Sequence, residues 1–163
     1  MSEEMVTWLT GLTGLTGLKE EGRKMSMFVK MFKPEFAELV RTGKKLQTIR
    51  PRPKRMPKVG DVVSLRRWAD KPYRSKHVIL GTRRIDEVAV VDITENGIVV
   101  NSYAEPSDDI ARADGFGNFF EMLEWFEREH GLPFEGIMIR WEPDLWSVSQ
   151  SELDAIKAKR ALE

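Results

Sequence analysis

Short runs rich in β-branched residues follow one another along the middle of this chain, and glycine or proline turn signals close most of them. The longest covers residues 77–94, and Asn96-Gly97 after it predicts a tight hairpin into residues 98–103. Further strands are expected at residues 28–32, 46–50, 62–68 and 134–141. Because no regular strand–helix–strand alternation joins these runs, the pattern predicts an α+β domain built on a small, mostly antiparallel β-barrel.

Helix signals lie between and after these runs. Pro34 suits the first turn of a helix that ends at Gly43, because that turn leaves its N–H groups unpaired anyway. A second amphipathic helix is expected at residues 118–129, with an asparagine as its N-cap. Ser149-Gln150-Ser151-Glu152 is a capping box, which predicts a helix to about residue 162. The domain thus has two main helices plus a C-terminal helix.

The two ends of the chain differ from its middle. Residues 1–26 form a low-complexity extension in which Thr10-Gly11-Leu12 recurs twice more, without helical or strand periodicity. Acidic residues stand near the start, where a signal peptide needs positive charge, so we do not expect export. We predict one compact domain at residues 27–146 and a helical appendage at residues 147–163.

Composition excludes several kinds of site. The 163 residues include no cysteine, so disulfides, thiolate zinc sites and cysteine nucleophiles are excluded. With only His77 and His130 available, we expect no metal site and no cofactor. No run approaches the roughly 20 apolar residues of a membrane span. We therefore predict a cytoplasmic protein without membrane partners, and the oligomeric state is left open.

The net charge of zero conceals two halves of opposite sign. Residues 41–84 hold 15 lysines and arginines against two acidic residues, whereas residues 85–147 hold 15 acidic residues against three arginines. A basic half of this kind is typical of a surface that binds phosphate groups. It is equally typical of two solvated faces that attract each other within the folded domain, and charge alone does not separate these interpretations.

Three short motifs stand out. The first, Gly43-Lys44-Lys45-Leu46-Gln47-Thr48-Ile49-Arg50, follows the first helix. The second, Lys58-Val59-Gly60-Asp61, precedes a strand, and the third, Ala113-Asp114-Gly115-Phe116, precedes the second helix. The first motif is not a Walker loop, because the upstream glycine spacing is missing and a strand follows the lysines.

Together with the closing strand Ile139-Arg140-Trp141-Glu142-Pro143, these motifs resemble, in order, those of the ASCH domain family. The resemblance covers residues 27–143 and implies a PUA-like β-barrel whose cleft suits RNA or a nucleoside. The chain resembles in particular small bacterial ASCH proteins that hydrolyse the amide of N4-acetylcytidine with a lysine, a threonine and a glutamate. The resemblance places the lysine and threonine on Lys45 and Thr48, and the glutamate on Asp114, which is one methylene shorter.

The chemistry sets conditions on these residues. Thr48 can act as a nucleophile or can position a water molecule, and Lys45 can act as its base only if burial lowers the lysine pKa. Residues three apart on a strand point to opposite faces, so the two share a cleft only if Lys45 still lies in the loop after Gly43. Without the resemblance, Thr48 is an ordinary strand residue and Lys45 a solvated one.

Candidate RNA contacts occupy the basic half. Arg50 suits a bidentate contact with a phosphate or a base edge, and the proline-rich loop that follows suits backbone contacts. Trp68 and Tyr73 lie among basic residues, the interleaving that base stacking requires, although Trp68 is equally typical of a core. The predicted nucleotide- or RNA-binding residues are Lys44, Arg50, Arg52, Lys54, Arg55, Arg66, Arg67, Trp68 and Tyr73.

Several functions are compatible with this sequence. An amidohydrolase acting on N4-acetylcytidine and a non-catalytic RNA-binding module are the two leading hypotheses. An endoribonuclease is a third, although no histidine is placed as an obvious base. A protein-interaction domain is the fourth, with the acidic helix at residues 121–129 as its docking surface.

Overall fold

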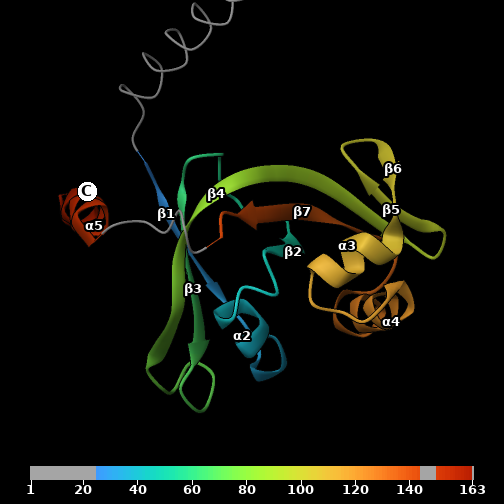
Figure 1. The fold of residues 1–163 in the computed structure, drawn as a ribbon, viewed down its shortest axis with the longest axis horizontal. Coiled ribbons are helices and arrows are strands. Elements are labelled where there is room, and N and C mark those ends of the chain that lie inside the picture. The colour runs from blue at the N-terminus through green and yellow to red at the C-terminus, as the bar shows by residue number, and fades with distance from the viewer. Residues whose placement is uncertain (1–24, 144–149, 163) are drawn as a thin grey trace, which may run out of the picture.

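The computed structural model describes residues 25–143 and 150–162. They form a mixed seven-stranded sheet with four helices packed around it, an α+β fold (Figure 1). The strands are β1 (Met27–Met31), β2 (Gln47–Pro51), β3 (Val62–Trp68), β4 (His77–Thr94), β5 (Gly97–Val100), β6 (Tyr103–Glu105) and β7 (Phe134–Trp141). The helices are α2 (Pro34–Arg41), α3 (Ser107–Ala113), α4 (Phe119–His130) and α5 (Gln150–Ala161).

The long strand β4 organises the sheet. Its first part pairs antiparallel with β3, and its second part pairs antiparallel with β7 and β5. β1 adds to β3 in parallel, β2 adds to β7 and β6 adds to β5. The prediction of mostly antiparallel pairing is confirmed. Within the described residues, however, no pairing closes the sheet into a ring, so hydrogen bonding alone does not make the predicted barrel.

Strand β7 separates two hydrophobic clusters. Met138 packs with the cluster beneath α4, whereas Ile137 and Ile139 pack with the cluster beneath α2. This alternation follows from the two-residue period of a strand. Both faces of the middle of the sheet are therefore covered, which explains the unbroken apolar run Ile137-Met138-Ile139 within β7.

Gly136 lets β2 approach β7. A Cβ atom at this position would lie 2.3 Å from the carbonyl oxygen of Arg50. Because Pro51 pairs with Gly136 in the register of the two strands, this close approach holds the end of β2 against the sheet. A larger residue at position 136 would push away the strand that carries Arg50.

Two elements differ from the expectation. The segment expected as one strand at residues 98–103 is a hairpin, because Asn101 and Ser102 adopt φ values of 48° and 73° and turn the chain between β5 and β6. Paired positive φ values of this kind are typical of two-residue hairpin turns. Helix α3 was not predicted, since its seven residues are too few to establish a helical period.

The other predicted helices are present. In α4 the Asn118 side chain accepts a hydrogen bond from the backbone N–H of Glu121 at 3.0 Å. The C-terminal helix α5 packs through Ile156 against Met27 and Val62 at the opposite end of the sheet from α4 (Figure 1). The capping serine at position 149 and the threonine-glycine-leucine tract lie outside the described residues. No helix in the described ranges is long and apolar enough to cross a membrane.

Candidate functional site

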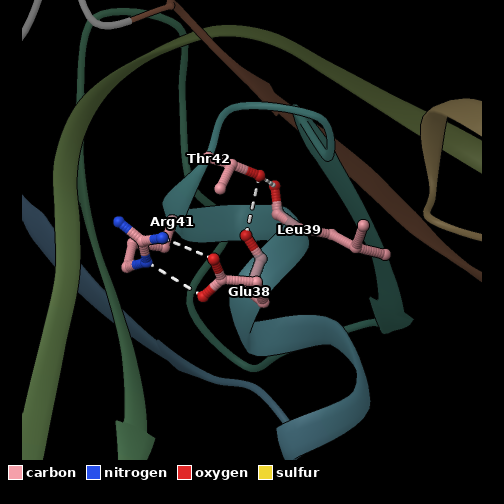
Figure 2. A network of polar contacts seen from close by, with 4 residues as sticks. All are labelled: Glu38, Leu39, Arg41 and Thr42. Carbon is pink, nitrogen blue, oxygen red and sulfur yellow. Dashed lines mark hydrogen bonds and ion pairs between the residues drawn. The ribbon is translucent and has the colours of Figure 1, made fainter.

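The end of α2 determines where Lys45 lies. The Thr42 hydroxyl donates to the carbonyl oxygen of Glu38 at 2.8 Å, and Arg41 pairs with the Glu38 carboxylate (Figure 2). Gly43 then adopts a φ of 79°, and the Lys45 N–H donates to the Leu39 carbonyl oxygen at 2.9 Å. Lys45 therefore still belongs to the loop when the strand begins two residues later, as a shared cleft with Thr48 requires.

Lys45 and Asp114 form a buried ion pair. Lys45 is 2% exposed and Asp114 is 4% exposed, and the Lys45 Nζ lies 3.3 Å from the Asp114 Oδ1. Nζ also donates a hydrogen bond to the backbone carbonyl oxygen of Asp114. The ammonium group lies 5.2 Å from the ring centroid of Phe36 and 5.8 Å from that of Phe32. The interpretation of Lys45 as a solvated side chain is therefore wrong.

Asp114 reaches this position through the end of α3. It is the C-cap of that helix, and its N–H donates to the Ile110 carbonyl oxygen at 3.0 Å. Gly115 follows with a φ of 98°, and a Cβ there would lie 3.2 Å from Phe36 and 3.3 Å from the Lys45 stem. The glycine thus provides both the backbone turn and the room for the lysine.

Thr48 and Arg50 project from one face of β2. The Arg50 Nε donates to the Thr48 Oγ1 at 3.0 Å, and its Nη2 donates to the Met31 carbonyl oxygen at 2.6 Å. The guanidinium also lies 5.0 Å from the ring centroid of Phe32. Because the Thr48 oxygen accepts from Arg50, its own hydrogen remains available for a ligand or a base.

One pocket brings these groups together. Its volume is about 210 Å³, and its lining includes Lys45, Thr48, Arg50 and Asp114. Aromatic side chains supply much of the remaining wall, namely Phe32, Phe36, Phe116 and Trp125. An apolar wall with a few convergent polar groups is the usual composition of a small-molecule site.

Burial shifts the protonation of the ion pair. Desolvation lowers the pKa of Lys45, and the nearby Asp114 carboxylate opposes this shift. Desolvation raises the pKa of Asp114, and Lys45 opposes that shift. The two pKa values therefore lie closer together than in water, so a proton passes between the groups at a lower free-energy cost.

Gln47 was not predicted as part of this site. It is fully buried on the other face of β2, and its Nε2 donates to the Ile110 carbonyl oxygen at 3.3 Å. A hydrogen bond from its side chain also favours the charged form of Asp114 and so opposes the rise in the pKa of that carboxyl that burial causes. Nothing in the sequence distinguished Gln47 from the other residues of the first motif, because its hydrogen-bond partners come from helix α3, which was not predicted.

The aromatic wall was also missed. Sequence spacing placed Phe116 and Trp125 in or near the core and gave them no function. Both pack against the core as half-buried side chains, but they also line the pocket. Their rings lie 5.8 Å apart and contact Phe36 as well. His130, at the end of α4, also lies on the pocket lining. The excess of aromatic residues around the third motif was the available signal.

Most of the predicted basic residues lie outside the pocket lining. Lys44, Arg52 and Lys54 are exposed, and the Arg55 guanidinium lies 5.0 Å from the Phe28 ring centroid. On β3, the Arg66 Nε donates to Ser64 at 2.8 Å, and an Arg67 nitrogen donates to the Trp68 carbonyl oxygen at 3.1 Å. The structure thus brings Arg50 to the site and spreads the other cations over the surface. Trp68 and Tyr73 line a neighbouring pocket, described below.

No known family model matches the sequence, and no curated protein matches it. Among solved structures, an ASCH protein from Zymomonas mobilis matches with 17% identity and a TM-score of 0.45, covering 82% of this chain and 80% of that chain. Two mutant forms of that protein match with 18% identity and TM-scores of 0.45 and 0.44. These neighbours carry the family name that the motifs suggested. Their similarity assigns no activity and no site residue to this chain.

Proposed function

We propose that this chain is a PUA-like ASCH domain whose pocket binds a modified cytidine and hydrolyses the amide of N4-acetylcytidine. The observation that carries the proposal is the buried Lys45–Asp114 pair in the same pocket as the Thr48 hydroxyl. A volume of about 210 Å³ lies below the roughly 300–1,000 Å³ of pockets for drug-sized ligands. A single base with a small acyl group suits such a space.

The pocket walls suit a planar ligand. Phe32, Phe36, Phe116 and Trp125 offer ring faces on which a base can stack. Arg50 is held in place by Thr48 and Met31, so it presents fixed N–H donors to oxygen atoms of the ligand. Stacking and fixed donors together orient the exocyclic amide towards Thr48.

Hydrolysis of this amide needs a nucleophile, a base and a proton donor for the leaving nitrogen. In the proposed reaction the Lys45 proton passes to Asp114, and the neutral amine then takes the proton of the attacking Thr48 hydroxyl or of a water molecule that Thr48 holds. The oxygen forms a bond to the acetyl carbon, and the bond from that carbon to N4 breaks. N4 receives a proton from the pair, and cytidine leaves. Where Thr48 is the nucleophile, a water molecule then hydrolyses the acetyl-threonine ester and regenerates the hydroxyl, so the net products of either route are cytidine and acetate.

A non-catalytic RNA-binding module is the second candidate. Pro51 lies on the pocket lining and Arg52 and Lys54, which are exposed, follow it directly. These side chains are available for the phosphates of an RNA strand whose base occupies the pocket. In this case base binding is retained and turnover is absent. Under either candidate we expect a cytoplasmic protein, as the sequence predicted.

The test is to incubate the protein with N4-acetylcytidine and to follow cytidine by chromatography. We expect turnover in the wild type and in Lys44→Ala, whose side chain is exposed next to the site, and none in Lys45→Met or Thr48→Val. Circular dichroism checks that the two inactive variants are folded. Full activity in both folded variants would overturn the assignment of the site. Absence of turnover in the wild type would overturn the hydrolase and favour the non-catalytic RNA-binding module.

A further inference from the structure

A second chamber adjoins the pocket. Its volume is about 400 Å³, and four residues of its lining also line the first pocket, namely Met31, Phe32, Lys33 and Arg50. The opposite side comes from the hairpin between β3 and β4, where Trp68, Pro72 and Tyr73 lie. The two chambers therefore adjoin at Arg50, and a ligand larger than one base can reach from one to the other past this side chain.

The far wall of this chamber presents two aromatic rings. The Trp68 and Tyr73 ring centroids lie 5.2 Å apart with the rings tilted by 49°, and the His77 ring packs against Trp68 at 4.5 Å. Tyr73 is 89% exposed, so core packing does not explain its place. An exposed aromatic ring beside an apolar chamber is typical of a stacking platform for a base.

The hairpin loop holds Tyr73 in a defined position. The Ala69 N–H donates to the Lys76 carbonyl oxygen at 2.8 Å, and the Asp70 N–H donates to the Ser75 hydroxyl at 3.0 Å. Tyr73 has a φ of 63°, which costs free energy for any residue other than glycine. A strained backbone that displays an exposed ring is a further indication that the ring has a binding role.

Cationic groups lie where the two chambers meet. Lys33 and Arg50 line both, and Arg50 Nη1 has no hydrogen-bond partner among residues 25–143 and 150–162. Lys33 contacts Glu129 at 2.9 Å, but its side chain is 51% exposed and can reach a ligand. An anionic group between two ring systems suits this boundary, and a phosphodiester is such a group.

We infer that the second chamber holds the nucleotide next to the base in the first pocket, with the linking phosphate at Arg50 and Lys33 and the neighbouring base on Tyr73 and Trp68. The inference rests on the proposed function, and it names the ligand as a nucleotide within a single-stranded RNA rather than a free nucleoside. Stacking of one base on an aromatic side chain typically changes affinity by about five-fold to more than 100-fold.

The test is to titrate the protein with cytidine and with the dinucleotides CpA and ApC by calorimetry, since these probes carry no acetyl group and bind without turnover. We expect one dinucleotide to bind at least about five-fold tighter than cytidine. Tyr73→Ala keeps a Cβ at the strained position and removes the ring, so it should abolish this preference and leave cytidine affinity unchanged. Tyr103→Ala, at an exposed tyrosine on β6, is the matched control and should keep the preference.

The outcomes separate the two proposals. Binding of cytidine without any gain for either dinucleotide would overturn the second chamber and leave the first pocket intact. A preference that survives in Tyr73→Ala, or an equal loss of cytidine and dinucleotide binding in that variant, would also overturn it. Failure of all three probes to bind the wild type would overturn this inference, whereas turnover of N4-acetylcytidine decides the proposed function separately. A preference that weakens as salt is raised would support the phosphate contact.

Discussion

Gly115 lies against Lys45 so closely that a Cβ atom on the glycine would come within 3.3 Å of the lysine Cδ. The same glycine has a φ of 98° and directly follows Asp114. The ion pair thus depends on a residue that has no side chain. Gly115 both leaves room for the Lys45 stem and turns the backbone so that the Asp114 carboxylate is in place.

Gly115→Ala is expected to lower stability by about 1–3 kcal/mol, from backbone strain and from contact with Phe36. Turnover should fall as well, because the added carbon displaces the Lys45 stem. Chemical denaturation and the N4-acetylcytidine assay measure the two effects. Gly131→Ala separates them, since Gly131 has a φ of 80° and a Cβ atom there would meet nothing within 4 Å. It should lose stability but keep activity, and equal activity in both variants would contradict the role of Gly115.

Arg50→Lys is expected to lower kcat/KM by about ten-fold or more. The substitution keeps the charge but removes the paired donors to Thr48 and Met31, and a hydrogen bond from a charged group contributes roughly 1.5–3 kcal/mol. Steady-state kinetics with N4-acetylcytidine measures the effect. Arg55→Lys is the control, because Arg55 stacks on Phe28 away from the pocket lining. An equal effect of the two substitutions would argue against a role for the Thr48 contact.

The pH dependence of turnover should reflect the neutral form of Lys45. While the pair holds its proton, only transfer to Asp114 frees the amine, whereas loss of the proton to solvent frees it completely. Activity should therefore rise with pH through the pKa of Lys45, which burial places below the usual value of 10.5. Because the Asp114 carboxylate opposes the shift, Asp114→Asn should lower the lysine pKa further and move the rising limb to lower pH. The pH profile of the residual turnover and the NMR titration of 13C-labelled lysine both measure the pKa of Lys45 in this variant. A limb that moves to higher pH would contradict the assigned pair.

The same pair affects stability at the two ends of the pH range. Where Lys45 is neutral in the folded state and still protonated in the unfolded chain, unfolding takes up a proton, so stability rises with pH up to about 10.5. Between the unfolded pKa of Asp114, 3.8, and its raised folded value, the folded state holds the extra proton and stability falls as pH rises. Lys45→Met should reduce the first slope, to which Lys30 also contributes because burial lowers its pKa as well. Urea denaturation at several pH values measures the change.

Ile156→Ala should lower the free energy of unfolding by about 2 kcal/mol or more, since Ile156 is 5% exposed against Met27 and Val62. These residues do not line the pocket, so kcat/KM per folded molecule should not change. Lys157→Ala on the exposed side of α5 is the control. A loss of activity at full folding would show that α5 acts on the site as well as on stability.

Much of the fold followed from local patterns. The turn at Asn96-Gly97, the proline at position 34 and the cap at Asn118 each fix a local backbone geometry, and the structure contains the corresponding elements. Helix α3 and the turn at Asn101 were not predictable in the same way. The first is too short for a period, and the second depends on contacts of Asn101 with Val90 of another strand.

The site was predictable only in part. The spacing of Lys45 and Thr48 indicated that the two could share a cleft only if Lys45 lay in the loop after Gly43, and the structure has that geometry. The pairing with Asp114 spans 69 residues and came from the family resemblance rather than from any local signal. Gln47 and the aromatic wall depend on how α3 and α4 pack on the sheet, so their place could not be read from the sequence.

Strand β2 has consequences for how this protein tolerates change in chain length. Its alternation sends Thr48 and Arg50 to the pocket, while Gln47 is buried on the side of α3. Deleting or inserting one residue between Gly43 and Gln47 would exchange the two faces of β2. Thr48 and Arg50 would then be buried on the side of α3, and the Gln47 side-chain amide would point into the pocket. Substitutions along β2 weaken the site by degrees, whereas a single-residue slip would replace one site by another of different chemistry.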